Sequence, residues 1–291
     1  MSLNHETGVD QYPTQNDIHT PVVPSLPATD DPATGERGPR QAERLKTLSA
    51  GMMAWLVNPT SHQTKALTVA QEVEVGLQLR SLLPPANSRC GTCGLSTSHG
   101  HDDVCSLVQF RRIARHNCIT KLIEVALKRL GGDAMVVREP HLIGDHHRTD
   151  LRVSGSAAPR GILTQFDFTF ISTSSVDASR VAYTTSKQQL ASGKGPWTAA
   201  QSALDAILTR KAATKTTLYQ QRLALRGISF IPLVFTLEGA AHLSATNTLK
   251  HWKSVLPSFP YFFSCFSTFL LRSRAQTYAL RQYDDQNVIA A

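Results

Sequence analysis

The sequence predicts an α/β fold in which a mixed sheet is flanked by helices, and three patterns carry this prediction. Apolar residues over 119–130 recur at helical spacing and stop at a pair of glycines, which indicates an amphipathic helix. Residues 162–171 alternate between apolar and polar side chains, and 228–237 form a strongly apolar run, so each predicts a strand. The predicted order of elements is helix, three strands, helix, strand.

The other elements of this core follow from shorter signals. Residues 135–138 and 150–153 predict two short strands between the first helix and the alternating strand. Residues 172–196 are rich in Ser, Thr and Gly, which predicts a long loop. Pro196 opens a second long helix, expected to run to about Arg226, because proline is favoured in the first turn of a helix. The following strand is expected to break at Pro232.

The predicted core comprises residues 111–239. The segments on either side of it differ from the core in composition. Residues 1–40 are rich in Pro, Thr, Asp and Asn and predict a disordered acidic arm. Residues 41–85 and 240–291 predict a helical segment and a C-terminal helical extension. The apolar run 255–271 contains prolines and is shorter than the roughly 20 residues of a membrane span, so no membrane partner is expected.

The charge of the chain is unevenly distributed. The formal net charge is +8, and the six acids and two bases of residues 1–40 give that arm a charge of −4. The rest of the chain therefore carries +12, since the two parts must sum to the whole. A body this basic favours a polyanionic partner, of which nucleic acid is the commonest. A basic soluble protein without such a partner is the alternative.

A cluster of cysteines and histidines in residues 86–110 predicts a small zinc module. The expected ligands are Cys90, Cys93, His101 and Cys105, with His99 as an alternative for the imidazole. Three thiolates and one imidazole at this spacing suit a tetrahedral Zn²⁺ site that is structural, because no coordination position stays open. The chain has five cysteines, an odd and low number that favours metal binding in a reducing compartment over a disulfide framework.

Two aspartates predict a second metal site. Asp150 opens one short strand and Asp167 lies within the next, so a hairpin of these strands would bring their carboxylates together. Carboxylate oxygens are the ligands that Mg²⁺ prefers, and such an ion can activate water against a phosphate. Glu139, at the end of the preceding strand, is a candidate third acid. The alternative is that these acids are ordinary surface residues, with Asp150 paired to a neighbouring arginine.

Two lysines of the second long helix lie on its apolar stripe. Lys211 and Lys215 continue the spacing of Leu204 and Leu208, and a lysine on such a stripe needs a nearby anion if it is buried. The predicted aspartates and a phosphate would supply one, and the lysine would then stabilise the charge of the transition state. The alternative is that each ammonium reaches solvent at the edge of the stripe.

His116, near the start of the first helix, has two interpretations. Its spacing from Ile119 and Ile123 turns it toward the core, which favours a structural histidine. Its place in the first part of a helix is also compatible with contact to a phosphate.

Several of these residues form an ordered set of motifs. The set comprises Cys90, Cys93, His101, Cys105, Arg115-His116-Asn117, Glu139-Pro140, Arg148-Thr149-Asp150, Asp167, Lys215, Tyr219 and Phe230-x-Pro232-Leu233-Val234. It resembles the C-terminal region of non-LTR retrotransposon polyproteins, in which a CCHC zinc knuckle precedes a restriction-like endonuclease of the PD-(D/E)XK class. The resemblance extends over residues 45–285, and the order of the motifs is more specific than any one of them.

The resemblance implies an αβββαβ endonuclease core, with Asp150 and Asp167 as ligands of Mg²⁺ or Mn²⁺ and Lys215 as the catalytic lysine. Family members nick target DNA so that reverse transcription is primed from the cut. The resemblance therefore implies DNA as the substrate and a reverse transcriptase as partner in the parent element, with RNA as a second nucleic-acid partner. Two positions depart from the class: Thr149 replaces a proline, and Thr169 replaces a lysine that some relatives carry on the following helix instead.

The sequence thus predicts a divalent-metal-dependent DNA endonuclease that is expected in the nucleus. One alternative is a nucleic-acid-binding zinc protein of the same fold that has lost cleavage or been adopted by the host. Another is a non-catalytic interaction module that uses the basic helices and the Phe-rich segment 257–270.

Overall fold

The structure is a computed structural model that describes Cys93, Val104, Cys105, Leu107 and residues 109–140, 148–173 and 175–288. At Gln109 and beyond Arg274 it describes the backbone alone. The predicted acidic arm, the helical segment 41–85 and most of the zinc module lie outside the described residues.

The described elements form the predicted succession of helix, three strands, helical crossover and strand, followed by two more helices. They are α5 (Gln109–Lys128), β1 (Met135–Arg138), β2 (Leu151–Ser154), the 3-10 turns η4 (Gly155–Ala157) and η5 (Pro159–Gly161), β3 (Thr164–Ile171), α6 (Val176–Ala191), α7 (Pro196–Ala224), β4 (Ser229–Thr236), α8 (Leu243–Val255) and α9 (Phe259–Val288).

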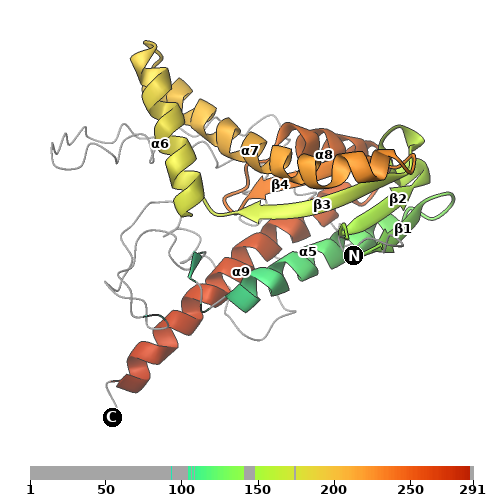
Figure 1. Cartoon of the computed structure of the whole chain (residues 1–291). Helices are drawn as coiled ribbons and strands as arrows, with labels where there is room; N and C mark the ends of the chain where they lie inside the picture. Colours follow the sequence, from blue (N-terminus) through green and yellow to red (C-terminus); the bar gives the residue numbers. More distant parts are fainter. Residues whose placement is uncertain are drawn as a thin grey trace, which may run out of the picture. The chain divides into compact units, whose positions relative to one another are not determined.

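The four strands form one mixed sheet in the order β1-β2-β3-β4. The pairs β1–β2 and β2–β3 are antiparallel, whereas β3 and β4 are parallel and are joined through α6 and α7. A parallel pair needs such a crossover, since a tight turn cannot return the chain to the same end of the sheet. In Figure 1, α5 and α9 run along one side of the sheet and α7 along the other. The prediction of an α/β fold with a mixed sheet flanked by helices is confirmed.

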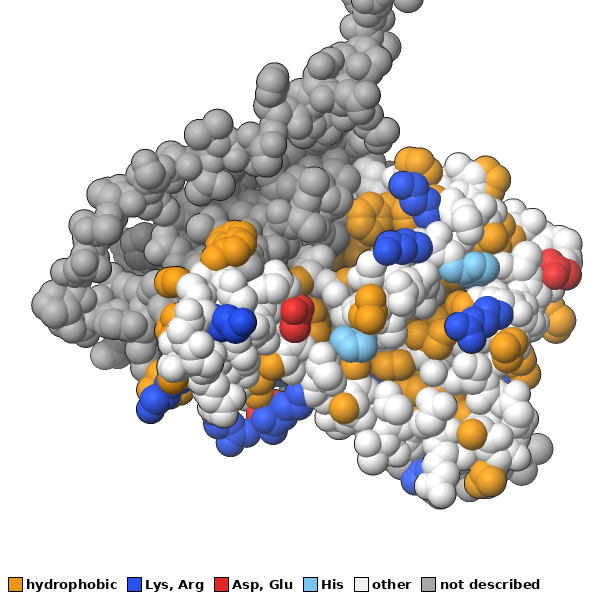
Figure 2. Space-filling model, turned by 90° about the horizontal axis from the view of Figure 1, so that it is seen from above, with side chains coloured by type: hydrophobic (Ala, Val, Ile, Leu, Met, Phe, Trp, Pro, Cys, Tyr) orange, Lys and Arg blue, Asp and Glu red, His pale blue; other side chains and the backbone are white. Residues whose placement is uncertain are grey.

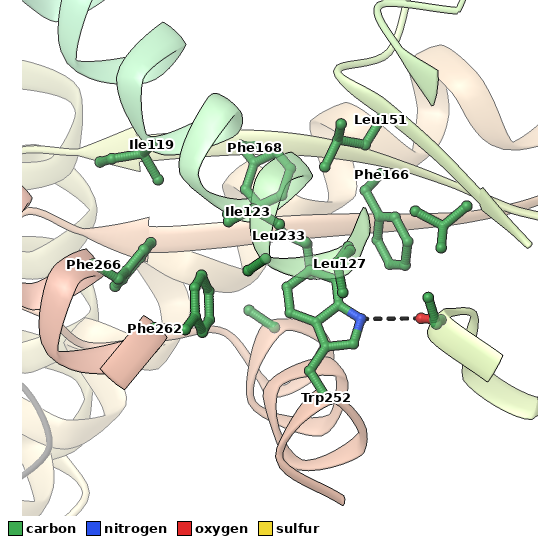
Figure 3. Packing of buried hydrophobic residues seen from close by; sticks show 14 of the residues in the cluster. Ile119, Ile123, Leu127, Leu151, Phe166, Phe168, Leu233, Trp252, Phe262 and Phe266 are labelled. Carbon is green, nitrogen blue, oxygen red and sulfur yellow. Dashed lines mark hydrogen bonds between the residues drawn. The ribbon is translucent and has the colours of Figure 1, made fainter. Parts of the chain in front are cut away.

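One face of the sheet carries the main hydrophobic core. Phe166 and Phe168 of β3 project from this face into a cluster completed by Ile123 of α5, Trp252 of α8 and Phe266 of α9, all of them buried. Figure 3 shows this packing, in which the indole Nε1 of Trp252 donates a hydrogen bond of 3.1 Å to the carbonyl of Ala157. The predicted C-terminal extension therefore contributes side chains to the same core as the sheet.

The opposite face of the sheet is covered by α7. Leu204, Leu208 and Ala212 pack against Val234 of β4, and further along the helix Tyr219 and Leu223 pack against Phe230. The alternate residues of β3, which are Gln165, Asp167 and Thr169, belong to this second face because successive side chains of a strand point in opposite directions. The predicted division of β3 into an aromatic face and a polar face thus places the polar residues under a helix.

The predicted loop over 172–196 is wrong, because most of it is the helix α6. Ser175 caps this helix by accepting a hydrogen bond from the backbone N–H of Ala178. Ala178 and Ala182 then pack against Ala203 and Ile207 of α7. Small side chains allow the two helices to pack closely, and this tertiary contact outweighs the weak helix propensity of a Ser- and Thr-rich segment.

The predicted break of the last strand at Pro232 is also wrong, since β4 continues through it. Pro232 lies opposite Asp167 in the parallel ladder. A proline is tolerated here because β4 is at the edge of the sheet, where a missing N–H need not interrupt a second ladder.

Most of the apolar run 255–271, which was not expected to span a membrane, lies in α9. Its buried residues Phe262, Phe266 and Leu270 recur at a spacing of four and belong to the core cluster. Within the described residues, no helix combines the length and the hydropathy that a membrane span requires.

Candidate active site

The hairpin of β2 and β3 brings the two predicted aspartates to neighbouring positions. Leu151 pairs with Phe166, so Asp150 and Asp167 fall on the next rung of the antiparallel ladder. Asp150 precedes β2 by one residue, and its carboxylate Oδ2 accepts a hydrogen bond of 2.6 Å from the backbone N–H of Phe168. The carboxylate of Asp150 is therefore held against the stretch of β3 that carries Asp167.

Lys215 reaches this position from α7. Its ammonium Nζ lies 2.8 Å from Oδ2 of Asp167, and the side chains of the two residues are 24% and 6% exposed. Thr169, two residues further along β3, donates a long hydrogen bond of 3.5 Å to the same carboxylate oxygen. The ion pair therefore spans two layers of the fold, from the helix to the sheet.

The electrostatics of Asp167 are unfavourable for its ionised form. Burial and, next, the negative charge of Asp150 raise the pKa of Asp167 above its usual 3.8, while Lys215 and His116 oppose the shift without cancelling it. The main cause is burial, and the second is the neighbouring negative charge of Asp150. A cation placed between the two carboxylates would offset the repulsion between them.

His116 also belongs to this group of residues. Its Nε2 lies 3.2 Å from Oδ2 of Asp150 and 3.3 Å from the carbonyl oxygen of Phe168. The hydrogen bond to Asp150 is the main reason why the pKa of His116 is raised above 6.5, although burial opposes it. One atom of α5 is thus in contact with two oxygens at the end of the hairpin. Neither interpretation from the sequence had paired His116 with Asp150, because helical spacing shows the side that a residue faces but not its partner.

Tyr219 connects α7 to the segment that leads into Asp150. Its hydroxyl donates a hydrogen bond of 3.1 Å to the carbonyl of Arg148, and its ring lies 5.9 Å from the Nζ of Lys215. Sequence reasoning assigned Tyr219 no role, although its position one turn after Lys215 was a signal that the two share a helix face.

Two predicted residues are placed differently. Lys211 is exposed. The side of α7 that faces the sheet carries Leu208, Ala212 and Lys215, and Lys211 lies next to this side and not on it. The expectation that it faces the apolar side is therefore wrong. Glu139 donates its backbone N–H to the carbonyl of Asp150, but its carboxylate forms an exposed ion pair of 3.0 Å with Arg148. The structure thus places this acid in a surface contact.

The predicted zinc module is described at two of its ligand positions. Cys105 is buried and Cys93 packs against it, so these two candidate ligands lie side by side. Cys90 and both candidate histidines, His99 and His101, lie outside the described residues. The zinc site therefore stays a prediction.

The group formed by Asp150, Asp167, Lys215 and His116 combines two carboxylates with an ammonium and an imidazole. Among the described residues, no three His, Cys, Asp or Glu side chains already form a complete metal site. A hard cation held by two carboxylates would take its other ligands from backbone carbonyls and water.

In comparisons with known proteins, no family model matches this chain, and no curated protein matches it either.

Proposed function

We propose that this chain is a divalent-metal-dependent DNA endonuclease with a restriction-endonuclease-like core of the PD-(D/E)XK class. The observation that carries the proposal is the buried 2.8 Å contact between Lys215 of α7 and Asp167 of β3, with Asp150 beside it. Two acids can hold a divalent cation and a lysine can stabilise the charge of a phosphate, so these residue types suit metal-assisted hydrolysis of a phosphodiester. The order of α5, β1, β2, β3, α7 and β4 agrees with the αβββαβ succession of this class, with α6 as an addition.

The residues at the end of the hairpin fit Mg²⁺ or Mn²⁺. The carboxylates of Asp150 and Asp167 would hold the ion. The carbonyl oxygen of Phe168 lies near Asp150, since Nε2 of His116 is 3.2 Å from Oδ2 of Asp150 and 3.3 Å from this carbonyl. When bound, the ion supplies a Lewis acid for the phosphate and lowers the pKa of a bound water.

Three side chains of the protein would contribute to cleavage besides the two aspartates. Lys215 adds a positive charge where negative charge develops on the phosphate, which stabilises the transition state most in a site with little water. His116 fixes the carboxylate of Asp150 from the side of α5. Tyr219 holds α7 to the segment before Asp150, so that the ammonium and the carboxylates keep their relative positions.

The charge of the molecule supports a nucleic-acid substrate. Residues 41–291 carry +12, which favours duplex DNA with an affinity that falls as salt rises. Figure 2 shows a face of the molecule on which Lys and Arg side chains are spread among uncharged ones and acidic side chains are sparse.

The origin of the chain belongs to the same proposal. The order of its motifs supports a relationship to the endonuclease region of non-LTR retrotransposon polyproteins, with a reverse transcriptase as partner in the parent element and the nucleus as the place of action. The proposed structural Zn²⁺ would be held by Cys90, Cys93, His101 and Cys105. The contact of Cys93 with buried Cys105 supports this part of the proposal.

A plasmid-nicking assay on the full chain tests the proposal. Supercoiled plasmid should become nicked circles with Mg²⁺ or Mn²⁺ and stay supercoiled in EDTA. Retention of supercoils with either metal, at protein concentrations that bind the DNA, would contradict it.

A second candidate would then apply, which is a nucleic-acid-binding protein that keeps the fold without cleavage. It is favoured by two positions at which the chain departs from the class, Thr149 and Thr169. Binding of DNA without nicking by the parent protein is the outcome that distinguishes this candidate from the enzyme.

A further inference from the structure

A buried amide lies on the same face of β3 as Asp167. Gln165 is fully buried, two residues before Asp167, and no part of its side chain reaches solvent. In the amide orientation that satisfies its neighbours, its nitrogen donates to Oγ1 of Thr149 at 2.6 Å. In that orientation its oxygen accepts from Nε and Nη2 of Arg152, each at 3.0 Å. Gln165 thus holds the residue before Asp150 and a guanidinium at the same time.

The position of Arg152 relative to the candidate site follows from the register of the hairpin. Arg152 pairs with Gln165, two rungs away from the rung of Asp150 and Asp167. Residues two apart on a strand share a face and are separated by about 6.6 Å. This spacing is comparable to the distance between successive phosphates of a nucleic-acid strand.

Arg152 differs from the surface arginines that pair with carboxylates. Arg148 pairs in this way with Glu139, and Arg180 with Asp177. In the part of the chain that the structure describes, Arg152 has no ion pair with an acid, and its hydrogen-bond partner is a neutral amide. The amide orients the guanidinium and leaves its positive charge uncompensated. A half-buried guanidinium with a fixed plane and an unused edge is suited to a phosphate.

We propose that Arg152, oriented by Gln165, binds the backbone phosphate next to the one held at Asp150 and Asp167. The inference rests on the proposed function, since it assumes a nucleic acid in the site. It assigns Arg152 to substrate binding and Gln165 to positioning. It also gives a role to Thr149, which is held by a hydrogen bond to Gln165 at the position where the class has a rigid proline.

The test measures DNA binding over a range of salt concentrations with Ca²⁺ in place of Mg²⁺. Fluorescence anisotropy of a labelled duplex gives Kd for the full chain and its variants. Arg152→Ala should weaken binding about tenfold at low salt and reduce the slope of log K against log salt by about 0.9, the value for one phosphate contact. Lys187→Ala, which removes the same charge from an exposed position of α6, should keep the parent slope.

A second variant separates orientation from charge. Gln165→Glu keeps the size of the side chain and can still accept from Arg152, but its carboxylate neutralises the guanidinium. It should therefore lose the same part of the salt slope as Arg152→Ala. Gln188→Glu, an equal charge change at an exposed position of α6, is its control. Thermal unfolding of each variant shows whether the fold is kept.

The possible outcomes distinguish this inference from the function on which it rests. A parent protein that binds DNA, with Arg152→Ala and Gln165→Glu binding like their controls, would overturn the role of Arg152 and leave the endonuclease proposal in place. A parent protein that binds no DNA at low salt would overturn both. If Arg152→Ala unfolds, loss of the salt slope in folded Gln165→Glu still supports the role, and an unchanged slope rejects it.

Discussion

Two carboxylates of this molecule are equally inaccessible to solvent but differ in the groups that surround them. The side chains of Glu124 on α5 and Asp167 on β3 are each 6% exposed. Glu124 is in contact with Lys121 at 3.1 Å and Lys128 at 2.7 Å, and the Nε of Arg138 is 4.0 Å away. Asp167 has one cation, Lys215, and a second acid, Asp150, as neighbours.

The pKa values of the two acids shift in opposite directions. Burial raises the pKa of Glu124, but the hydrogen bonds and charges of Lys128 and Lys121 outweigh it and hold the pKa below 4.5. For Asp167, burial and the charge of Asp150 together outweigh the contribution of Lys215, so the pKa is above 3.8. Low solvent exposure alone therefore does not set the direction of the pKa shift. Glu124 has two lysine partners, whereas Asp167 lies deeper among neighbouring atoms and next to a second acid.

The largest effect that this comparison predicts is on cleavage. Asp167→Asn keeps the shape of the side chain but removes the charge that would hold a divalent cation. Nicking should fall by about a thousandfold, equivalent to roughly 4 kcal/mol of barrier, while DNA binding is kept or slightly tighter. Single-turnover nicking of a supercoiled plasmid with Mg²⁺ measures the rate.

Glu124→Gln is the matched control, since it removes one negative charge from a carboxylate that is equally inaccessible to solvent. It should nick DNA at the parent rate. If Asp167→Asn nicks as fast as the parent, or if the two variants lose the same activity, the distinction between the two acids fails.

The next effect compares two lysines one turn apart on α7. Lys215→Ala should lower the rate of nicking by about a hundredfold, because the proposed mechanism uses this ammonium to stabilise the charge of the phosphate. Mg²⁺ binding should be kept, since Lys215 competes with a cation for Asp167 and is not a ligand. Isothermal titration with Mg²⁺ and single-turnover nicking give the two quantities.

Lys211→Ala removes the same group from an exposed position of the same helix. It should behave like the parent in both measurements. Equal losses in the two lysine variants would show that α7 contributes general positive charge and not one positioned ammonium.

The smallest effect is on stability, and its sign reverses between the two acids. A raised pKa means that Asp167 favours folding below pH 3.8 and loses this contribution as pH rises through its pKa in the folded protein. A lowered pKa means that Glu124 favours folding above pH 4.5 and loses this contribution as pH falls through its pKa in the folded protein.

In EDTA, Asp167→Asn should therefore gain free energy of unfolding relative to the parent as pH rises from 3 to 7. Glu124→Gln should be less stable than the parent by about 1–2 kcal/mol at pH 7, and the difference should close toward pH 3. Urea unfolding at several pH values measures both. Curves of the two variants that shift in the same direction would reject the assignment.

The elements of the core were predictable from the sequence because each has a strong local pattern. The alternation of β3 gave its bounds to within two residues and separated Asp167 from the aromatic face. The helix α6 was missed because its apolar residues are small and its stability comes from α7, a contact that no local pattern records. The difference in exposure between Lys211 and Lys215 depends on which side of α7 packs against the sheet. A shift of one residue in the amphipathic pattern would reverse the exposure of the two lysines.

The contacts within the site were less predictable than the residues that make them. Convergence of Asp150 with Asp167 follows from a hairpin, and a hairpin was expected. The contact of His116 with Asp150 joins residues 34 positions apart on different layers, and it depends on how α5 crosses the sheet. The hydrogen bonds of Gln165 were equally hard to predict, because its two partners, Thr149 and Arg152, are not adjacent to it in the sequence.

The edge strand β4 also determines how this protein can associate with others. Pro232 has no N–H to offer, and its carbonyl accepts a hydrogen bond from the hydroxyl of Ser244. The carbonyl of Val234 accepts from the backbone N–H of His242, so this edge has few groups left for a further strand. At the other edge, Met135 and Val137 of β1 are exposed, and no hydrogen bond within the described residues covers the outer side of that strand. Among the described residues, β1 is therefore the edge with the feature that favours strand-to-strand association, whereas β4 is the protected one.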